Sequence, residues 1–309
     1  METFKTWGIL APELREHCLS YCGLSELSQY AQCSKLSNTE IQKFDTTAPE
    51  SVKLAEIGND QNLQICLQYP TNREVSLHFL QSAPNTYKLV RSEQEIQNAQ
   101  IIPGNARQDA LQYLENRFRY GKNGTTNSIQ IACKHWPEEL LRKIPALCRA
   151  PQWEVHVTQA MYDAFMECMS DNPNVQSLCL DNNEVVPFVI PATFFKTRLF
   201  QQLKIAIFHP PCSIEDEDFL ASTATELALN SSTISDNAIN MKIQNWYDDH
   251  DVEINFLAIR TPNGRVFNLD EILIDLPIDE AAGGECIIER QDGMVGKLYI
   301  QGGEFVFFN

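Results

Sequence analysis

The segments Leu203-Lys-Ile-Ala-Ile207, Leu227-Ala-Leu229 and Leu257-Ala-Ile259 share one pattern, in which apolar residues alternate with other residues. A period of two residues is typical of β-strands. Three earlier segments have the same pattern: Ile129-Gln-Ile131, Val155-His-Val157 and Leu178-Cys-Leu180. The strands therefore begin roughly every 25 residues, a spacing that indicates a repeated strand–helix unit.

Signals for helices lie between these strands. Pro137 and Pro191 suit the first turn of a helix, where the missing N–H is not needed. Capping residues precede other apolar segments, namely Thr158, Ser235, the pair Ser213 and Asp216, and the pair Asn268 and Glu271. One such unit cannot cover its own apolar face, so we expect neighbours to stack, with parallel strands on one side and helices on the other. An ordinary mixed α/β domain also fits, because the consensus leucine-rich motif is absent.

The regions that flank this repeat have different patterns. Between residues 50 and 92, alternating segments with short polar separators predict a small antiparallel β meander. Arg91 to Gln108 is polar and contains a Pro-Gly pair, which predicts a loop or hinge, and a helix is expected from Asp109 to Tyr120. Near the C-terminus, Asp292-Gly293 predicts the turn of a β hairpin, and a last strand is expected at Phe305 to Phe308.

The composition limits the classes of partner. The chain has 309 residues and a formal net charge of −17. This charge repels phosphate backbones, so we expect no nucleic-acid partner, and either a basic protein surface as partner or simply high solubility. We expect no membrane association and a cytoplasmic and/or nuclear location, because no apolar run of about 18 residues and no signal-peptide core are found. The 10 cysteines are scattered without a C-x-x-C pair, which indicates reduced thiols.

Two short amphipathic helices are predicted near the N-terminus. Pro12 suits the start of the first, Gly23 its end, and Ser25 the cap of the second. Helices so short have little core of their own. Their apolar faces need a neighbour, which is either the rest of the chain or another protein.

The segment from Leu10 to Lys35 resembles an F-box. The matching residues, in the order and spacing of that pattern, are Leu10, Glu13-Leu14, Leu19-Ser-Tyr21, Leu24, Leu27 and Cys33-Ser-Lys35. Pro12 stands one place later than in the usual pattern, and Cys18, Cys22 and Cys33 replace larger aliphatic residues. The resemblance implies docking on the Skp adaptor, and through it on a cullin scaffold. The residues expected at this contact are Leu10, Pro12, Leu14, Cys18, Leu19, Leu24, Leu27 and Tyr30.

The segment from Thr233 to the C-terminus is similar to the type 2 F-box-associated region of nematode F-box proteins. The similarity rests on Ser235-Asp236, Asn240, Ile243, Trp246, Ile254 to Ile259, Ile288 to Gly293 and the final aromatic run. Arg290-x-Asp-Gly293 is its most specific element. Together the two resemblances imply a substrate receptor of an SCF-type ubiquitin ligase. Some receptors of this group are thought to remove foreign proteins, including toxins.

The expected fold is α/β, with a leucine-rich-repeat-like strand–helix solenoid closed by the C-terminal hairpin. The expected parts are an F-box module in residues 1–48, a β meander and connector in 49–108, and a substrate-binding domain in 109–309 that includes the F-box-associated region 233–309. If Ile129 and Ile131 point into the core, alternate strand positions lie on the opposite side of the sheet. We expect the substrate to bind there, on Gln130, His156, Cys179, Lys204, Ala206, Ala228, Ala258 and Arg260.

No catalytic residue, cofactor or metal site is expected. Asp248 to Asp251 offers metal-ligating atoms but suits a solvated turn, and Cys133 and His135 lack a third, orienting group. Gly121 to Thr126 lacks the spacing of a phosphate-binding loop. We therefore expect a non-catalytic subunit that holds a protein target for ubiquitination and degradation. The alternative is a binding protein outside any ligase, which sequesters or neutralises its target.

Overall fold

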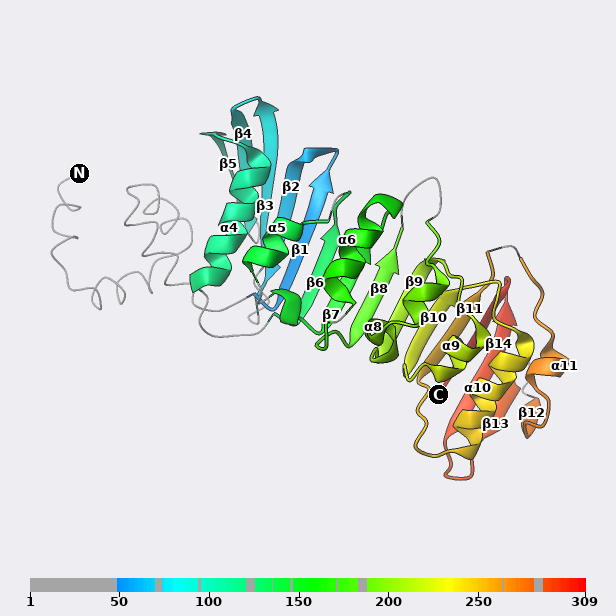
Figure 1. Cartoon of the computed structure of the whole chain (residues 1–309). Coiled ribbons are helices and arrows are strands. Elements are labelled where there is room, and N and C mark those ends of the chain that lie inside the picture. The colour runs from blue at the N-terminus through cyan, green and yellow to red at the C-terminus, as the bar shows by residue number, and fades with distance from the viewer. Residues whose placement is uncertain are drawn as a thin grey trace, which may run out of the picture. The chain divides into compact units, whose positions relative to one another are not determined.

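The computed structural model describes residues 49–309, except 70–73, 94–95, 121–125, 135, 145–146, 171, 183–187, 263 and 281–285. The described chain forms two compact units (Figure 1). The first unit holds residues 49–52, 57–126 and 139–147, and the second holds 53–56, 127–138 and 148–309. Strand β1 (Ser51–Ile57) contributes residues to both.

The first unit contains the predicted antiparallel meander. Its strands are β2 (Asn59–Gln68), β3 (Glu74–Ala83), β4 (Thr86–Glu93) and β5 (Ile96–Pro103), and they pair in this order. The alternation that predicted β3 is also seen in its burial, because Val75, Leu77 and Phe79 are at most 3% exposed. The meander is therefore confirmed.

The loop or hinge expected from Arg91 to Gln108 is wrong. Residues 96–103 instead form β5, which pairs with β4 from Thr86↔Pro103 to Glu93↔Ile96. An edge strand is held by backbone hydrogen bonds on one side, so it can form from a segment whose side chains, here Ile-Gln-Asn-Ala-Gln-Ile-Ile-Pro, do not alternate regularly between apolar and polar. Helix α4 (Ala106–Tyr120) follows and packs against β2, β3 and β4, with Ala106, Ala110 and Leu114 buried.

The second unit is built on a parallel sheet. Its strands β6 (Ser128–Ala132), β7 (Gln152–His156), β8 (Ser177–Asp181), β9 (Ile205–Pro211), β10 (Glu226–Asn230) and β11 (Phe256–Arg260) are neighbours in sequence order. All five pairs are parallel. The six predicted strands and the mixed α/β class are thus confirmed.

Helices follow these strands in the chain. They are α5 (Glu138–Lys143), the 3₁₀ turn η3 (Leu147–Arg149), α6 (Gln159–Met169), α7 (Ala192–Phe195), α8 (Arg198–Gln201), α9 (Asp216–Ala221), α10 (Asp236–Asp248) and α11 (Leu269–Ile272). Connections between adjacent parallel strands are right-handed, so successive helices fall on the same face of the sheet. Figure 1 shows α6, α9 and α10 on one side of the strands.

The core of the second unit lies between the sheet and these helices. One residue from each parallel strand aligns across it, in the row Ile129, Trp153, Leu178, Ala206, Leu227 and Leu257. All six are at most 3% exposed. Phe194 adds edge-on ring contacts with Phe195 and Phe208 beside this row, with ring centroids 5.3 and 5.4 Å apart. Aromatic rings favour this geometry because of their quadrupoles.

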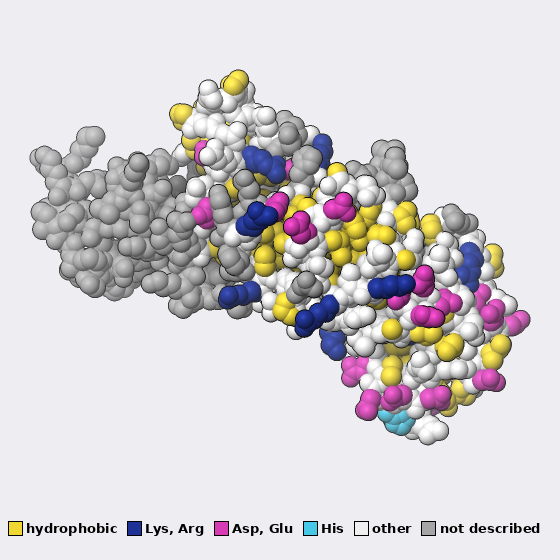
Figure 2. All heavy atoms as spheres, in the orientation of Figure 1, with side chains coloured by type: hydrophobic (Ala, Val, Ile, Leu, Met, Phe, Trp, Pro, Cys, Tyr) yellow, Lys and Arg dark blue, Asp and Glu magenta, His cyan; other side chains and the backbone are white. Residues whose placement is uncertain are grey.

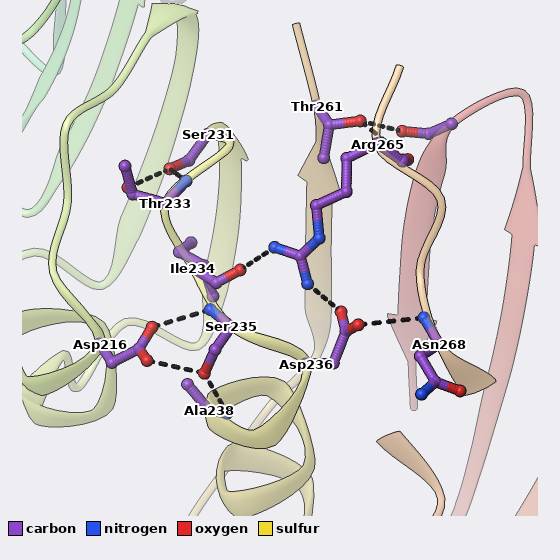
Figure 3. Close-up of polar contacts among 11 residues, drawn as sticks. Asp216, Ser231, Thr233, Ile234, Ser235, Asp236, Ala238, Thr261, Arg265 and Asn268 are labelled. Atoms are coloured by element: carbon purple, nitrogen blue, oxygen red, sulfur yellow. Dashed lines mark hydrogen bonds and ion pairs between the residues drawn. The ribbon is translucent and has the colours of Figure 1, made fainter. Parts of the chain in front are cut away.

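Ser235 caps α10 as predicted, and its Oγ accepts a hydrogen bond of 3.0 Å from the Ala238 N–H. Asp216 was expected to pair with Ser213 in a cap, and this is wrong. Glu215 occupies the N-cap of α9, and the Asp216 carboxylate instead accepts hydrogen bonds from the Ser235 N–H at 2.9 Å and from its hydroxyl at 2.6 Å (Figure 3). The residue thus joins α9 to the start of α10.

A second carboxylate fixes the same helix end from the other side. Asp236 accepts a hydrogen bond of 3.0 Å from the Asn268 N–H and forms an ion pair with Arg265, which also donates to the Ile234 carbonyl (Figure 3). An acid at a helix N-terminus is favoured by the helix dipole. The segment before α11 is therefore tied to α10.

A buried lysine side chain donates hydrogen bonds at the C-terminal end of α9. Lys242 of α10 is 6% exposed, and its Nζ donates to the carbonyls of Phe219, Leu220 and Ser222 at 3.2, 3.4 and 2.5 Å. The last carbonyls of a helix have no partner within it, so this ammonium supplies their donors. Burial lowers the pKa of Lys242 to about 8.

Antiparallel strands complete the C-terminal end of the sheet. β15 (Glu304–Phe308) pairs with β11, β14 (Val295–Gln301) with β15, β13 (Cys286–Glu289) with β14, and β12 (Ile278–Glu280) with β13. The predicted hairpin is confirmed, since Gly293 lies in the turn between β13 and β14 with φ +87°. A positive φ at this place favours glycine over residues with a Cβ.

Arg290 joins this hairpin to α10. Its side chain is 3% exposed and donates to both carboxylate oxygens of Asp292, at 3.0 and 2.5 Å, and to the Trp246 carbonyl at 3.0 Å. The guanidinium also lies 5.3 Å from the centre of the Trp246 ring. The hydrogen bonds from Arg290 hold the pKa of Asp292 at about 2.

Replacement of Arg290 by Met should lower the free energy of unfolding by about 1–3 kcal/mol, because it removes the donor to the Trp246 carbonyl and breaks the ion pair with Asp292, whose side chain is 30% exposed. Urea denaturation followed by tryptophan fluorescence measures this change. Because the pKa of Asp292 in the folded protein lies below its ordinary value of 3.8, the stabilisation by the pair is complete above pH 4 and declines as the pH falls toward 2. The difference in unfolding free energy between the wild type and Arg290→Met should therefore narrow as the pH falls from 4 toward 2.

Arg260→Met is the matched control. Arg260 is paired with Glu304 at 3.3 Å, but its side chain is 61% exposed. An exposed ion pair contributes about 1 kcal/mol or less. Equal losses of unfolding free energy in both variants would contradict the conclusion that Arg290 joins the hairpin to α10.

Gly296 lies where the rings of Phe307 and Trp246 meet. A Cβ built on Gly296 would lie 2.5 Å from Phe307 and 2.9 Å from Trp246, both of which are fully buried. Gly296→Ala should therefore destabilise the second unit by about 1–3 kcal/mol, the usual cost of overpacking a core. Lys297→Ala, one residue further along the same strand, changes an exposed side chain and should alter the thermal midpoint little. A tolerated alanine at 296 would contradict this packing.

Candidate functional site

The candidate site is the face of the parallel sheet opposite α6, α9 and α10, which we call the open face. Burial alternates along β6, β7, β8 and β10, so that one residue is buried and the next is half-exposed. The half-exposed residues point away from the helices. In the part of the chain that the structure describes, this face is left available to a partner.

Strand register arranges the open face in rows. The central row runs across Gln130, Glu154, Cys179, Ile207, Ala228, Ala258 and Val306. A neighbouring row runs across Ser177, Ile205, Glu226, Phe256 and Phe308. The open face therefore changes from polar residues on β6–β8 to mostly apolar residues on β9, β10, β11 and β15.

Two carboxylates and an imidazole meet at the polar end. His156 and Asp181 are register partners on β7 and β8, and His156 Nδ1 lies 3.5 Å from Asp181 Oδ2. On the other side, His156 Nε2 lies 4.0 Å from Glu154 Oε1, which also accepts a hydrogen bond from Gln130. The side chains of Glu154 and Asp181 are 45% and 32% exposed. Both carboxylates can therefore reach a ligand on this face.

Cys179 lies next to this group and brings together the residue types of a thiol nucleophile and its base. Burial, together with the nearby charges of Glu154 and Asp181, raises the pKa of Cys179 to about 11. A nucleophilic thiol needs a lowered pKa. The electrostatics of the group thus favour binding a cation over forming a thiolate.

Most of the predicted substrate-binding residues lie on the open face. Gln130, His156, Cys179 and Ala228 are half-buried at outward positions. Ala258 is in register with Ala228 and Val306 but is only 4% exposed, because a methyl group is easily covered by such neighbours. That it faces a partner stays a prediction.

The other three predicted residues have different surroundings. Arg260 is exposed and paired with Glu304. Lys204 is exposed but precedes β9, and its N–H donates to the Gln176 carbonyl at 2.7 Å. Ala206 is 0% exposed and in register with Leu178 and Leu227 of the core, so its assignment to the open face is wrong. On β9 the outward residues are Ile205 and Ile207. Their apolar character suggested burial, but register decides which side of the sheet they take.

The sequence argument also missed the acidic residues. Glu154 stands two residues before His156, and Asp181 stands two residues after Cys179 and opposite His156. The period of two that selected His156 and Cys179 would therefore have selected both acids. Phe256 stands two residues before Ala258, so the same period would have selected it, whereas Phe308 joins this row only through the antiparallel pairing of β11 with β15.

The predicted adaptor-binding residues Leu10, Pro12, Leu14, Cys18, Leu19, Leu24, Leu27 and Tyr30 lie outside the described residues. His135 and Gly121 to Gly124 also lie outside them. Cys133 is buried, and its thiol donates to the Leu54 carbonyl at 3.8 Å.

Acidic residues of the helix-bearing side do not gather into a metal site in the described part of the chain. Figure 2 shows Asp and Glu side chains over the C-terminal part of that side. Asp248 is the last residue of α10, and Asp249 and Asp251 follow it; all three are exposed, which agrees with the expected solvated segment. The described helices also include none with the length and apolar character needed to cross a membrane.

Cys148 and Cys168 form a thiol pair that the sequence did not indicate. A hydrogen bond between the side chains lowers the pKa of Cys148 to about 7, because the Cys168 S–H stabilises the Cys148 thiolate. The same contact raises the pKa of Cys168. Both residues are half-buried.

Iodoacetamide at pH 7.5 should therefore modify Cys148 at least about tenfold faster than Cys179, since the thiolate is the reactive form. Peptide mass spectrometry over time measures both rates in one sample. Cys168→Ala removes the donor and should slow the modification of Cys148. An unchanged rate in this variant would contradict the thiol pair.

Comparisons with models of protein families, with curated proteins and with solved structures found no match.

Proposed function

We propose that this protein is the substrate-recognition subunit of an SCF-type ubiquitin ligase. The open face of the second unit is the observation that carries the proposal, because it offers a broad, half-exposed surface with both charged and apolar residues. The resemblance of Leu10 to Lys35 to an F-box supplies the expected link to the Skp adaptor. In this interpretation the second unit is a leucine-rich-repeat-like solenoid, and the protein acts in the cytoplasm or nucleus.

The proposed mechanism is proximity. The N-terminal segment holds the protein on the adaptor and cullin, while the open face holds a target protein whose lysines then meet a ubiquitin-charged conjugating enzyme. Tethering raises the effective concentration of the target and orients it, which can replace bond chemistry by the receptor itself. Specificity then depends on what the open face binds.

Co-expression of the full chain with a Skp adaptor tests the ligase role. The wild-type protein should co-purify with the adaptor, and the double variant Leu14→Glu, Leu19→Glu should lose it, because charges would be placed in an apolar interface. A double variant on the open face, Gln130→Lys with Ala228→Lys, should keep the adaptor, since its substitutions lie at the proposed target site.

Two results would oppose this proposal. The wild-type protein could elute without adaptor, or Leu14→Glu with Leu19→Glu could change nothing. Either result would favour the second candidate, a binding protein that sequesters or neutralises its target through the same face. The half-exposed open face supports that candidate as well, because it does not depend on the N-terminal segment.

A further inference from the structure

The charges of the open face are of one sign over five adjacent strands. The residues of β6, β7, β8, β9 and β10 include the acids Glu154, Asp181 and Glu226, and no Lys or Arg. Cations lie at the borders of this region, among them Lys53 on β1, the strand beside β6. Lys204 precedes β9, and Arg260 on β11 is paired with Glu304. The three carboxylates therefore face solvent without a Lys or Arg on their own strands.

Apolar residues stand beside one of these acids, Glu226, in register. Ile205, Glu226 and Phe256 are neighbours in one row across β9, β10 and β11. Phe256 is 37% exposed, although it is a large aromatic residue. Exposed aromatic residues beside charged residues are typical of protein interfaces, where the aromatic group anchors the contact and the charges select the partner.

We propose that the open face binds a basic protein segment that carries a Lys or Arg and a large apolar side chain. The cation is held between Glu154 and Asp181, beside His156, and the apolar side chain packs on Phe256 and Ile205. The proposal rests on the proposed function, in which a target protein is held on this face. It adds the chemistry by which the target is chosen.

The sheet also sets the spacing within that segment. Asp181 on β8 and Phe256 on β11 are separated by three strand-to-strand steps, about 14 Å across the sheet, and by about 13 Å along the strands, because Ser177, four residues before Asp181, is the β8 residue in the row of Phe256. A straight partner segment would span the resulting distance of about 19–20 Å with about six residues if extended, or about 13 residues if helical. The basic and apolar residues of the partner should be that far apart.

A random peptide library displayed on phage is the probe, with the full-length protein immobilised. Enriched peptides should contain Lys or Arg and an aromatic or large aliphatic residue at one of these two spacings. Fluorescence anisotropy with the enriched peptides then measures affinity for the variants. Glu154→Lys with Asp181→Lys should weaken binding at least about tenfold, because attraction becomes repulsion. The milder pair Glu154→Gln with Asp181→Asn and the single change Phe256→Ala should each weaken it severalfold.

Asp163→Lys with Glu167→Lys is the matched control. Both residues are exposed on α6, in the helix layer, and the change in net charge is the same. This variant should bind the peptides as the wild type does. A thermal unfolding curve for each variant checks that it folds. If Glu154→Lys with Asp181→Lys does not fold, the neutral variant Glu154→Gln with Asp181→Asn still tests the site.

Three outcomes would overturn the inference. They are enrichment of acidic or uncharged peptides, no enrichment above background, and equal loss of binding in the α6 control. Adaptor co-purification is measured on the same proteins. If peptides bind as expected while the adaptor does not, the ligase role fails and the basic-segment site stands. If the adaptor binds and the peptides do not, only the site fails.

Discussion

One-sided burial of the parallel strands is the constraint on which the second unit depends. Each strand contributes its apolar positions to a layer of helices on one face, and the right-handed connection returns every helix to that same face. Trp153, Leu178 and Leu227 are therefore buried, while the residues that alternate with the buried ones along β7, β8 and β10 are mostly half-exposed. The open face is a direct consequence of how the core is built, and function can use it without disturbing that core.

A repeat of this kind needs a defined end, because its last strand would otherwise present unpaired backbone groups. Here β15 covers β11, and the hairpin of β13 and β14 continues the sheet. Arg290 then joins the hairpin to the C-terminal end of α10 by hydrogen bonds that Trp246 and Asp292 accept. The segment Arg290 to Gly293 thus helps to hold this end of the unit together.

Charge acts locally as well as globally in this protein. The net charge of −17 describes the whole chain, but binding on the open face depends on where its carboxylates lie. Glu154 and Asp181 face the same side of the sheet as Cys179 and raise the pKa of its thiol, and they attract cations for the same reason. By contrast, Asp216 and Asp236 are used within the fold, where they fix the start of α10.

The sequence by itself determined the strands, because a period of two residues and short polar separators are local features. It also determined most outward positions, such as Gln130, His156 and Cys179. Tertiary structure alone decided the side taken by Ala206 and Ile207, because β9 begins at Ile205 and its pairing with β8 and β10 fixes the register. It also decided that residues 96–103, which lack a regular alternation of apolar and polar residues, form β5, since the partner strand supplies the hydrogen bonds, and that Lys242 is buried, since the carbonyls it serves lie 20 or more residues away. Local pattern fixes what a segment can form, whereas partners distant in the chain fix which of its side chains meet solvent.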